Sequence, residues 1–210
     1  MRPVVERMEP PRSLYCDFPL GRPLGRPNDA DFQHDVLTRA FAMLDAPAGP
    51  VLHDYPVAIE AETEAVACNL PARFDPDLHP AIDEINGIRG AWDRSTAQRP
   101  TSTGRVLDVD ELGTAIDCLQ AIVDGTPWRE AAIPGNNTTA MCHDLRTYYE
   151  EAALELVTTT AGQAPGGRGV ENWFFTETEA GKLVLEARRA LKAADAPFGV
   201  WFYMAPGHWN

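Results

Sequence analysis

The sequence predicts an α/β protein, and two observations carry this prediction. Residues 12–57 follow the order strand, loop, helix, strand, which is that of a βαβ unit with two parallel strands. In the carboxyl half, apolar residues recur at steps of three and four, the spacing of one helix face. A chain of 210 residues can bury one substantial core, so length alone requires no second domain.

The predicted βαβ unit begins with a short strand over residues 12–18 (RSLYCDF). A loop rich in proline and glycine follows, in which the phrase LGRP occurs twice. Asn28 or Asp29 can then cap a helix that runs to about Leu44, because the apolar positions repeat at helical spacing. Residues 51–57 are predicted to form the second strand. A parallel pair places the loop at the carboxyl end of the first strand, where ligands bind in such sheets.

Helices are predicted for most of the remaining chain. They are expected over residues 79–92, 108–124, 138–159 and 176–194, with a short one over 127–132. The last of them begins at a capping box, Thr176-x-x-Glu179. Residues 198–204 (FGVWFYM) are apolar on both faces, which is typical of a buried strand.

These elements suggest three consecutive segments. Residues 1–93 are expected to form the α/β segment, and the polar residues 94–107 an exposed connection. Residues 108–210 are expected to form a helical half with a terminal strand, packed with the rest into one domain.

The charge balance excludes two classes of partner. Acidic residues outnumber basic ones by 31 to 18, for a formal net charge of −13. A surface of that sign repels phosphate backbones and anionic lipids, so nucleic-acid and membrane partners are not expected. No stretch approaches the roughly 18 apolar residues that span a bilayer, and none at the amino terminus has signal-peptide length. We therefore expect a cytoplasmic protein.

Cysteine and histidine spacing indicates no metal site. The 4 cysteines include no CxxC pair, and the 5 histidines form no HxH or HExxH. In a reducing compartment the cysteines are expected to be free thiols. No metal is predicted, and the sequence identifies no cofactor.

The doubled LGRP phrase is the most unusual segment. Gly21 and Gly25 can adopt positive φ and allow close approach of the backbone, while Arg22 and Arg26 supply positive charge beside a helix amino terminus. These four residues are candidates to bind a small anionic substrate. The alternative is a rigid connection whose arginines face water.

Residues 12–56 resemble the carboxyl-terminal part of the glycine/sarcosine/betaine/D-proline reductase selenoprotein B family. That family shows a strand, then a phrase like FPLGxPLGxPxDxxxQxxVLxxAxxLL, then G-x-V-x-D-hydrophobic-Pro. The positions that fit in register are Phe18, Pro19, Leu20, Gly21, Pro23, Leu24, Gly25, Pro27, Asp29, Gln33, Val36 and Leu37.

The resemblance implies a partial flavodoxin-like parallel sheet and an association with thiol-dependent reductive cleavage of a carbon–nitrogen bond. The family's attacking selenocysteine or cysteine lies in a segment with no counterpart here, so no catalytic residue is carried over. Residues 58–210 match nothing in the family. A partner chain is therefore expected to supply the redox thiol or selenol.

Three residues are candidates for chemistry within this chain. Cys142, near a helix amino terminus, could be a thiolate stabilised by the helix dipole, with His143 lowering its pKa. Neighbouring helical residues point about 100° apart, however, so Cys142 could equally belong to a buried stripe with His143 in water. Cys16, at the end of the first strand, is the third candidate.

The leading hypothesis is a subunit of a thiol-dependent reductase-like enzyme acting on a small anionic, amino-acid-like substrate, with Cys16 or Cys142 as a resolving thiol. Two alternatives stay open. One is a self-sufficient cysteine-dependent lyase. The other is a non-catalytic interaction subunit that packs through the aromatic carboxyl end, although core packing also explains those aromatic residues.

Overall fold

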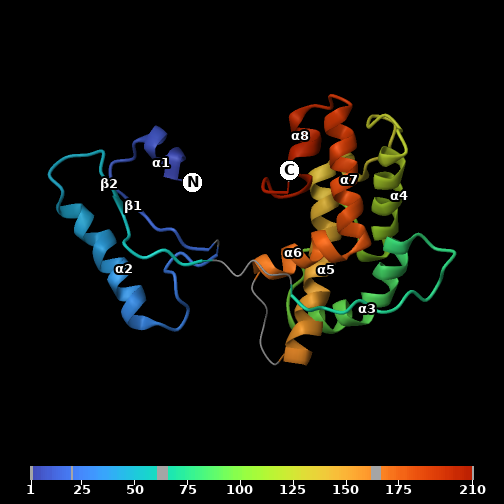
Figure 1. Cartoon of the computed structure of the whole chain (residues 1–210), viewed down its shortest axis with the longest axis horizontal. Helices are drawn as coiled ribbons and strands as arrows, with labels where there is room; N and C mark the ends of the chain where they lie inside the picture. Colours follow the sequence, from blue (N-terminus) through green and yellow to red (C-terminus); the bar gives the residue numbers. More distant parts are fainter. Residues whose placement is uncertain (1, 20, 61–65, 162–166, 210) are drawn as a thin grey trace. The chain divides into compact units, whose positions relative to one another are not determined.

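The structure, a computed structural model, describes residues 2–19, 21–60, 66–161 and 167–209. The chain consists of two compact units, Met1–Glu62 (unit 1) and Thr63–Asn210 (unit 2) (Figure 1). The division falls after Glu62 rather than near residue 93. Residues 80–93 pack with the helical half, because the helix that contains them lies along the longest helix of unit 2.

Unit 1 contains the βαβ arrangement. Its elements are α1 (Arg2–Met8), β1 (Ser13–Tyr15), α2 (Ala30–Ala42), the 3-10 turn η1 (Met43–Asp45) and β2 (Leu52–Asp54). The strands pair in parallel with Leu14 opposite His53, which confirms the predicted strand order and direction. Within the described residues this sheet has two strands. The helix-rich α/β class is thus confirmed at this coarse level.

Local capping explains where α2 begins. The Asp29 carboxylate accepts the backbone N–H of Phe32 at 3.0 Å, so Asp29 is the cap that the sequence suggested. Val36 is the buried residue of the helix. Three rings of unit 1, Phe18, Phe32 and Tyr55, pack on one another with centroids 5.4–5.7 Å apart and form its aromatic cluster.

Unit 2 is a helical bundle built around α5. Its elements are α3 (Pro80–Gln98), η2 (Val109–Glu111), α4 (Leu112–Val123), η3 (Pro134–Asn136), α5 (Thr138–Ala161), α6 (Gly167–Glu177), α7 (Glu179–Ala193), α8 (Phe198–Trp201) and η4 (Phe202–Met204). Helix α5 contacts α3, α4, α6 and α7 (Figure 1). Two fully buried tyrosines fix α5 to α3: Tyr148 donates to the carbonyl of Ile85 at 2.6 Å and Tyr149 to that of Ala81 at 3.2 Å.

Residues 94–107 were expected to form an exposed connection, and this prediction is wrong at both ends of the range. Helix α3 continues to Gln98, with Ser95 buried and Arg94 paired to Glu155 of α5 at 3.3 Å. The residues that follow are held by carboxylates of α5, and Leu107 is buried. Packing against α5 thus orders a polar stretch whose composition predicts a loop.

Helix α7 begins two residues later than its predicted capping box. Its cap is Thr178, whose hydroxyl accepts the N–H of Gly181 at 2.9 Å. Thr176 instead belongs to α6, a helix that the sequence analysis did not predict, and donates to the carbonyl of Asn172. The apolar side chains of α6 enter the core, which accounts for a helix directly after a glycine-rich stretch.

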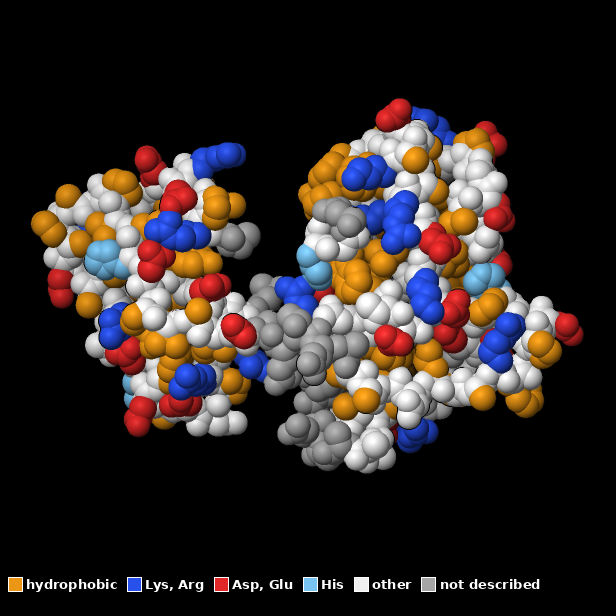
Figure 2. Space-filling model, viewed as in Figure 1, with side chains coloured by type: hydrophobic (Ala, Val, Ile, Leu, Met, Phe, Trp, Pro, Cys, Tyr) orange, Lys and Arg blue, Asp and Glu red, His pale blue; other side chains and the backbone are white. Residues whose placement is uncertain are grey.

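The predicted strand over residues 198–204 is a helical turn, α8 followed by η4. The described part of unit 2 contains no strand with which it could pair, and its rings pack on one another instead. Phe198 and Tyr203 stay exposed, and Figure 2 shows apolar side chains gathered over this part of unit 2. The short helix predicted over 127–132 is likewise only a turn.

Among the described helices, none has both the length and the apolar character that crossing a membrane requires.

Candidate functional site

The loop with the doubled LGRP phrase follows the carboxyl end of β1 and leads into α2. Gly21 and Gly25 have φ of 84° and 79°, so both adopt the positive φ that the sequence analysis expected. Gly25 is buried, and a Cβ there would collide with the side chains of Phe32 and Ile59. The second glycine is therefore required by close packing of the loop on the aromatic cluster.

The two arginines of the loop differ in their partners. Arg26 pairs with Asp29 at 3.7 Å, and its guanidinium lies 4.8 Å from the ring centroid of Phe32. Arg22 is half-buried and has no ion pair with any residue that the structure describes. Since Asp29 also caps α2, the chain's own carboxylate occupies part of the predicted anion site. Of the two arginines of the loop, Arg22 is the one without a carboxylate partner among the described residues.

Cys16 lies between β1 and this loop and is half-buried. Burial raises the pKa of its thiol above the ordinary value. The nearby Tyr55 hydroxyl donates to Asp35 at 2.8 Å, and Arg39 pairs with the same carboxylate at 2.8 Å. These two contacts hold the pKa of Asp35 below its ordinary value. No base is hydrogen-bonded to Cys16 among the described residues, so it is not an activated thiolate.

Cys142 and His143 are not arranged as a nucleophile and its base. Cys142 is 2% exposed in the core of unit 2, and burial raises the pKa of its thiol far above the ordinary value. His143 is half-buried, and its ring contacts the hydroxyl of Thr147 at 3.3 Å. Burial, then Arg105 and Arg146, lower the pKa of His143. The buried-stripe interpretation of Cys142 agrees with this geometry.

The candidate cysteines belong to different units. Cys16 belongs to unit 1 and Cys142 to unit 2. Cys68 and Cys118 are also buried in unit 2, where burial raises the pKa of each to about 11. Within the described residues no group of three or more histidine, cysteine and acidic side chains could hold a metal ion.

No family model, curated protein or solved structure matches the chain. The resemblance of residues 12–56 therefore remains an expectation drawn from the motif.

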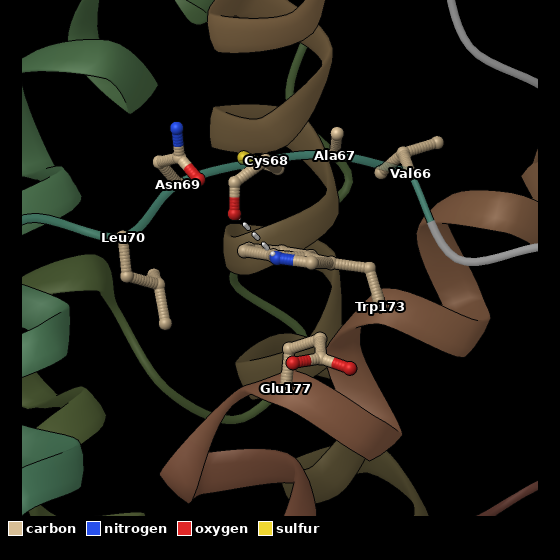
Figure 3. A pocket seen from close by; sticks show the side chains of 7 residues that line it. All are labelled: Val66, Ala67, Cys68, Asn69, Leu70, Trp173 and Glu177. Atoms are coloured by element: carbon tan, nitrogen blue, oxygen red, sulfur yellow. Dashed lines mark hydrogen bonds between the residues drawn. The ribbon is translucent and has the colours of Figure 1, made fainter.

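Unit 2 contains a cavity that the sequence analysis missed. Its volume is about 520 Å³, and it lies between the extended residues 66–70 and two side chains of α6, Trp173 and Glu177 (Figure 3). The indole N–H of Trp173 donates to the carbonyl of Cys68 at 2.9 Å. The two walls come from segments far apart in the sequence, so no local spacing could have indicated them.

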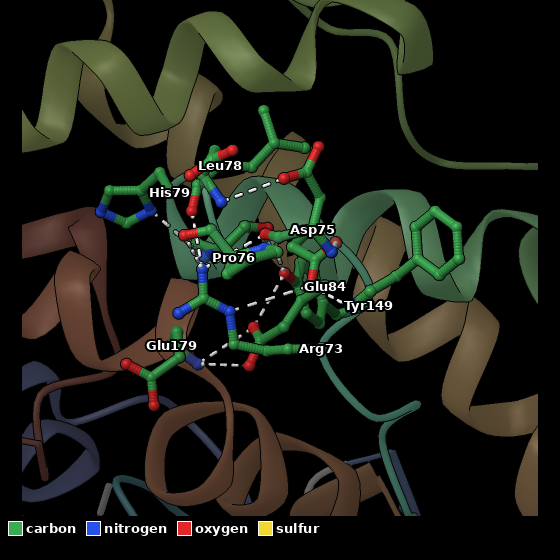
Figure 4. A network of polar contacts seen from close by, with 12 residues as sticks. Arg73, Asp75, Pro76, Leu78, His79, Glu84, Tyr149 and Glu179 are labelled. Carbon is green, nitrogen blue, oxygen red and sulfur yellow. Dashed lines mark hydrogen bonds and ion pairs between the residues drawn. The ribbon is translucent and has the colours of Figure 1, made fainter.

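A partly buried polar network lies beside the start of α3 (Figure 4). The Glu84 carboxylate accepts the backbone N–H groups of Glu179 at 3.0 Å and Ala180 at 3.4 Å. It also lies 3.1 Å from the Tyr149 hydroxyl, which shares its one proton between Glu84 and the carbonyl of Ala81. Burial raises the pKa of Glu84, and the two N–H groups oppose this rise. Its partners are the amino terminus of α7 and a core tyrosine, so Glu84 ties α3 to α7.

The residues before α3 join the same network. The Arg73 guanidinium donates to the carbonyls of Leu78 at 2.8 Å and Pro76 at 3.2 Å, and lies 3.9 Å from the Asp83 carboxylate. Asp83 in turn accepts the N–H of Phe74 at 2.9 Å. Arg73, Asp83 and Glu84 each have partners within the chain, which indicates a structural role.

Proposed function

We propose that the chain is a subunit of a thiol-dependent reductase-like enzyme that acts on a small anionic, amino-acid-like substrate. A partner chain supplies the redox thiol or selenol, and the complex works in the cytoplasm. The observation that carries this proposal is the position of the LGRP loop. It follows the carboxyl end of a parallel strand and holds Arg22 half-buried without an ion pair to the described residues.

The segment that resembles the reductase family lies within unit 1. Residues 12–56 contain β1, the loop, α2 and β2, and unit 1 ends at Glu62. In the proposal these elements form one part of a flavodoxin-like sheet. Each strand has three residues, and a two-stranded sheet of that size gains little stability by itself. Pairing with strands of a partner would supply what it lacks.

The states of the cysteines favour a thiol supplied from outside the chain. A nucleophilic thiol needs a pKa near or below neutral pH, whereas burial raises the pKa of all four cysteines. The alternative of a self-sufficient cysteine-dependent lyase gains no support from these environments. Cys16, the least buried of the four, is the one that a partner's redox group could reach as a resolving thiol.

The alternative of a non-catalytic interaction subunit stays open. Helix α2 and the turn η1 that follows it expose three large apolar side chains, Leu37, Phe41 and Leu44. Exposed apolar side chains that gather in one place are typical of a contact surface. This observation fits either a catalytic or a non-catalytic subunit, and only the thiol of the partner distinguishes the two.

Purification of the tagged chain from its native host tests the proposal. We expect a stoichiometric partner with a reactive cysteine or selenocysteine, and a complex that cleaves a small amino-acid-like carboxylate when a dithiol is supplied as reductant. Replacement Arg22→Ala should raise the KM for that substrate about tenfold or more, since a charged hydrogen bond is lost. Arg7→Ala, an exposed arginine of α1, is the matched control. A chain that emerges alone would remove the basis of the proposal.

A further inference from the structure

We propose that the cavity between residues 66–70 and α6 binds a small molecule that carries a protonated amine on an apolar body. The cavity lies wholly in unit 2, and the inference does not rest on the reductase proposal. Its volume of about 520 Å³ falls within the usual range for small-molecule sites, roughly 300–1,000 Å³.

The charge of the site comes from Glu177. Its carboxylate is exposed at the cavity and lies 3.2 Å from the Thr176 hydroxyl, whose shorter hydrogen bond, at 2.8 Å, goes to the carbonyl of Asn172. No lysine, arginine or histidine of the described residues lies within ion-pair distance of it. Lys182 is close enough to feel its charge but is itself paired with Glu179 at 2.7 Å. An unpaired carboxylate in a pocket favours a cation over an anion. The net charge of −13 acts in the same direction.

The apolar part of the lining comes from Val66, Ala67 and Leu70. Val66 and Leu70 are half-buried at the cavity, and Trp173 is almost fully buried beneath it (Figure 3). The hydrogen bond from Trp173 to the carbonyl of Cys68 holds the two walls together without a ligand. A preformed wall lowers the ordering cost of binding. The amide of Asn69 adds one neutral polar group.

The second cavity of unit 2 lacks these properties. It has a volume of about 220 Å³, below the usual range. Its charged residue Arg89 already pairs with Asp93 at 3.0 Å and with Asp110 at 2.6 Å. The charge of Arg89 is thus already balanced by carboxylates of the chain, unlike that of Glu177 in the first cavity.

The probe that tests the proposal is 2-phenylethylamine, titrated into the full-length chain and followed by isothermal calorimetry and by backbone amide shifts. Phenylacetate and 2-phenylethanol have the same ring with an anionic and a neutral group. We expect the amine to shift residues 66–70 and α6, and to bind more tightly than either analogue. Glu177→Gln should weaken amine binding about tenfold, as loss of a charge-assisted contact does.

Glu186→Gln is the matched control, because Glu186 is an exposed carboxylate on α7 outside the cavity. It removes the same charge from the chain and should leave the affinity unchanged. If both variants bound the amine equally weakly, the effect would come from the net charge of the chain rather than from Glu177, and that result would overturn the proposal. So would amide shifts confined to residues outside the cavity, or amine binding weaker than about 10 mM. Thermal melts of both variants confirm that each is folded.

Discussion

The carboxylate of Asp144 on α5 accepts the backbone N–H of Val106 at 2.8 Å. Three neighbouring N–H groups, those of Gly104, Arg105 and Leu107, point at the same fully buried side chain, at 3.0–3.2 Å. One side chain thereby satisfies four backbone donors. It fixes the path of the chain between α3 and η2.

Removal of this carboxylate should destabilise unit 2 strongly. In Asp144→Ala four N–H groups lose their acceptor, so we expect the free energy of unfolding to fall by about 3 kcal/mol or more. Urea unfolding followed by tryptophan fluorescence measures this, since all 5 tryptophans lie in unit 2. Asp117→Ala, an exposed acidic residue of α4, should change the stability little. Equal loss in the two variants would contradict the role given to Asp144.

Glu150 should make unit 2 less stable as pH rises. Burial raises its pKa from the ordinary 4.5 to about 7, with Arg146 opposing and Glu171 adding to the rise. Because the folded pKa lies above the unfolded one, the neutral acid is favoured on folding. Its contribution is complete below about pH 4.5 and is lost progressively up to about pH 7.

Glu150→Gln should therefore raise the free energy of unfolding at pH 8 by up to about 2 kcal/mol, and change it little at pH 4.5. Unfolding curves of the wild type and the variant at the two pH values check this. Glu186→Gln again serves as control, with no expected change at either pH. A loss of stability at pH 8 would mean that the Arg146–Glu150 ion pair, at 3.3 Å, outweighs burial.

Alkylation should distinguish the four thiols. With iodoacetamide near neutral pH, Cys16 should react first and Cys142 last, because Cys16 is half-buried and Cys142 is 2% exposed. Even Cys16 should react more slowly than free cysteine, since burial raises its pKa. Mass spectrometry of tryptic peptides over time measures each rate. Rapid labelling of any one cysteine would instead revive the lyase hypothesis.

Local sequence patterns were sufficient to predict the structure where a segment packs on residues close to it in the sequence. The helix capped by Asp29, the positive φ of Gly21 and Gly25, and the parallel pair with β2 all follow from short-range patterns, and the structure confirms them. Glycine is the residue for which the sequence alone indicates a left-handed conformation. These features lie in unit 1, which contains the doubled LGRP phrase.

Local sequence patterns did not predict the structure where contacts with residues far away in the sequence determine it. Residues 198–204 have the composition of a strand, but the described part of unit 2 offers them no sheet. Arg94 continues α3 through contact with Glu155, which is 61 residues away. The cavity at Trp173 depends on Cys68, which is 105 residues away. Contacts between residues so far apart in the sequence cannot be predicted from local periodicity.

The two loop glycines should respond differently to the same substitution. Both have positive φ, so Ala at either position costs about 1 kcal/mol of backbone strain. At Gly21 a Cβ meets nothing within 4 Å, whereas at Gly25 it collides with Phe32 and Ile59. Gly25→Ala should therefore destabilise unit 1 by a further 1–3 kcal/mol or so, as overpacking does.

Hydrogen exchange of residues 13–19 and 52–59, followed by mass spectrometry, reports on unit 1, which contains no tryptophan. Faster exchange in Gly25→Ala than in Gly21→Ala is expected, and equal exchange would show that the loop does not pack on the aromatic cluster.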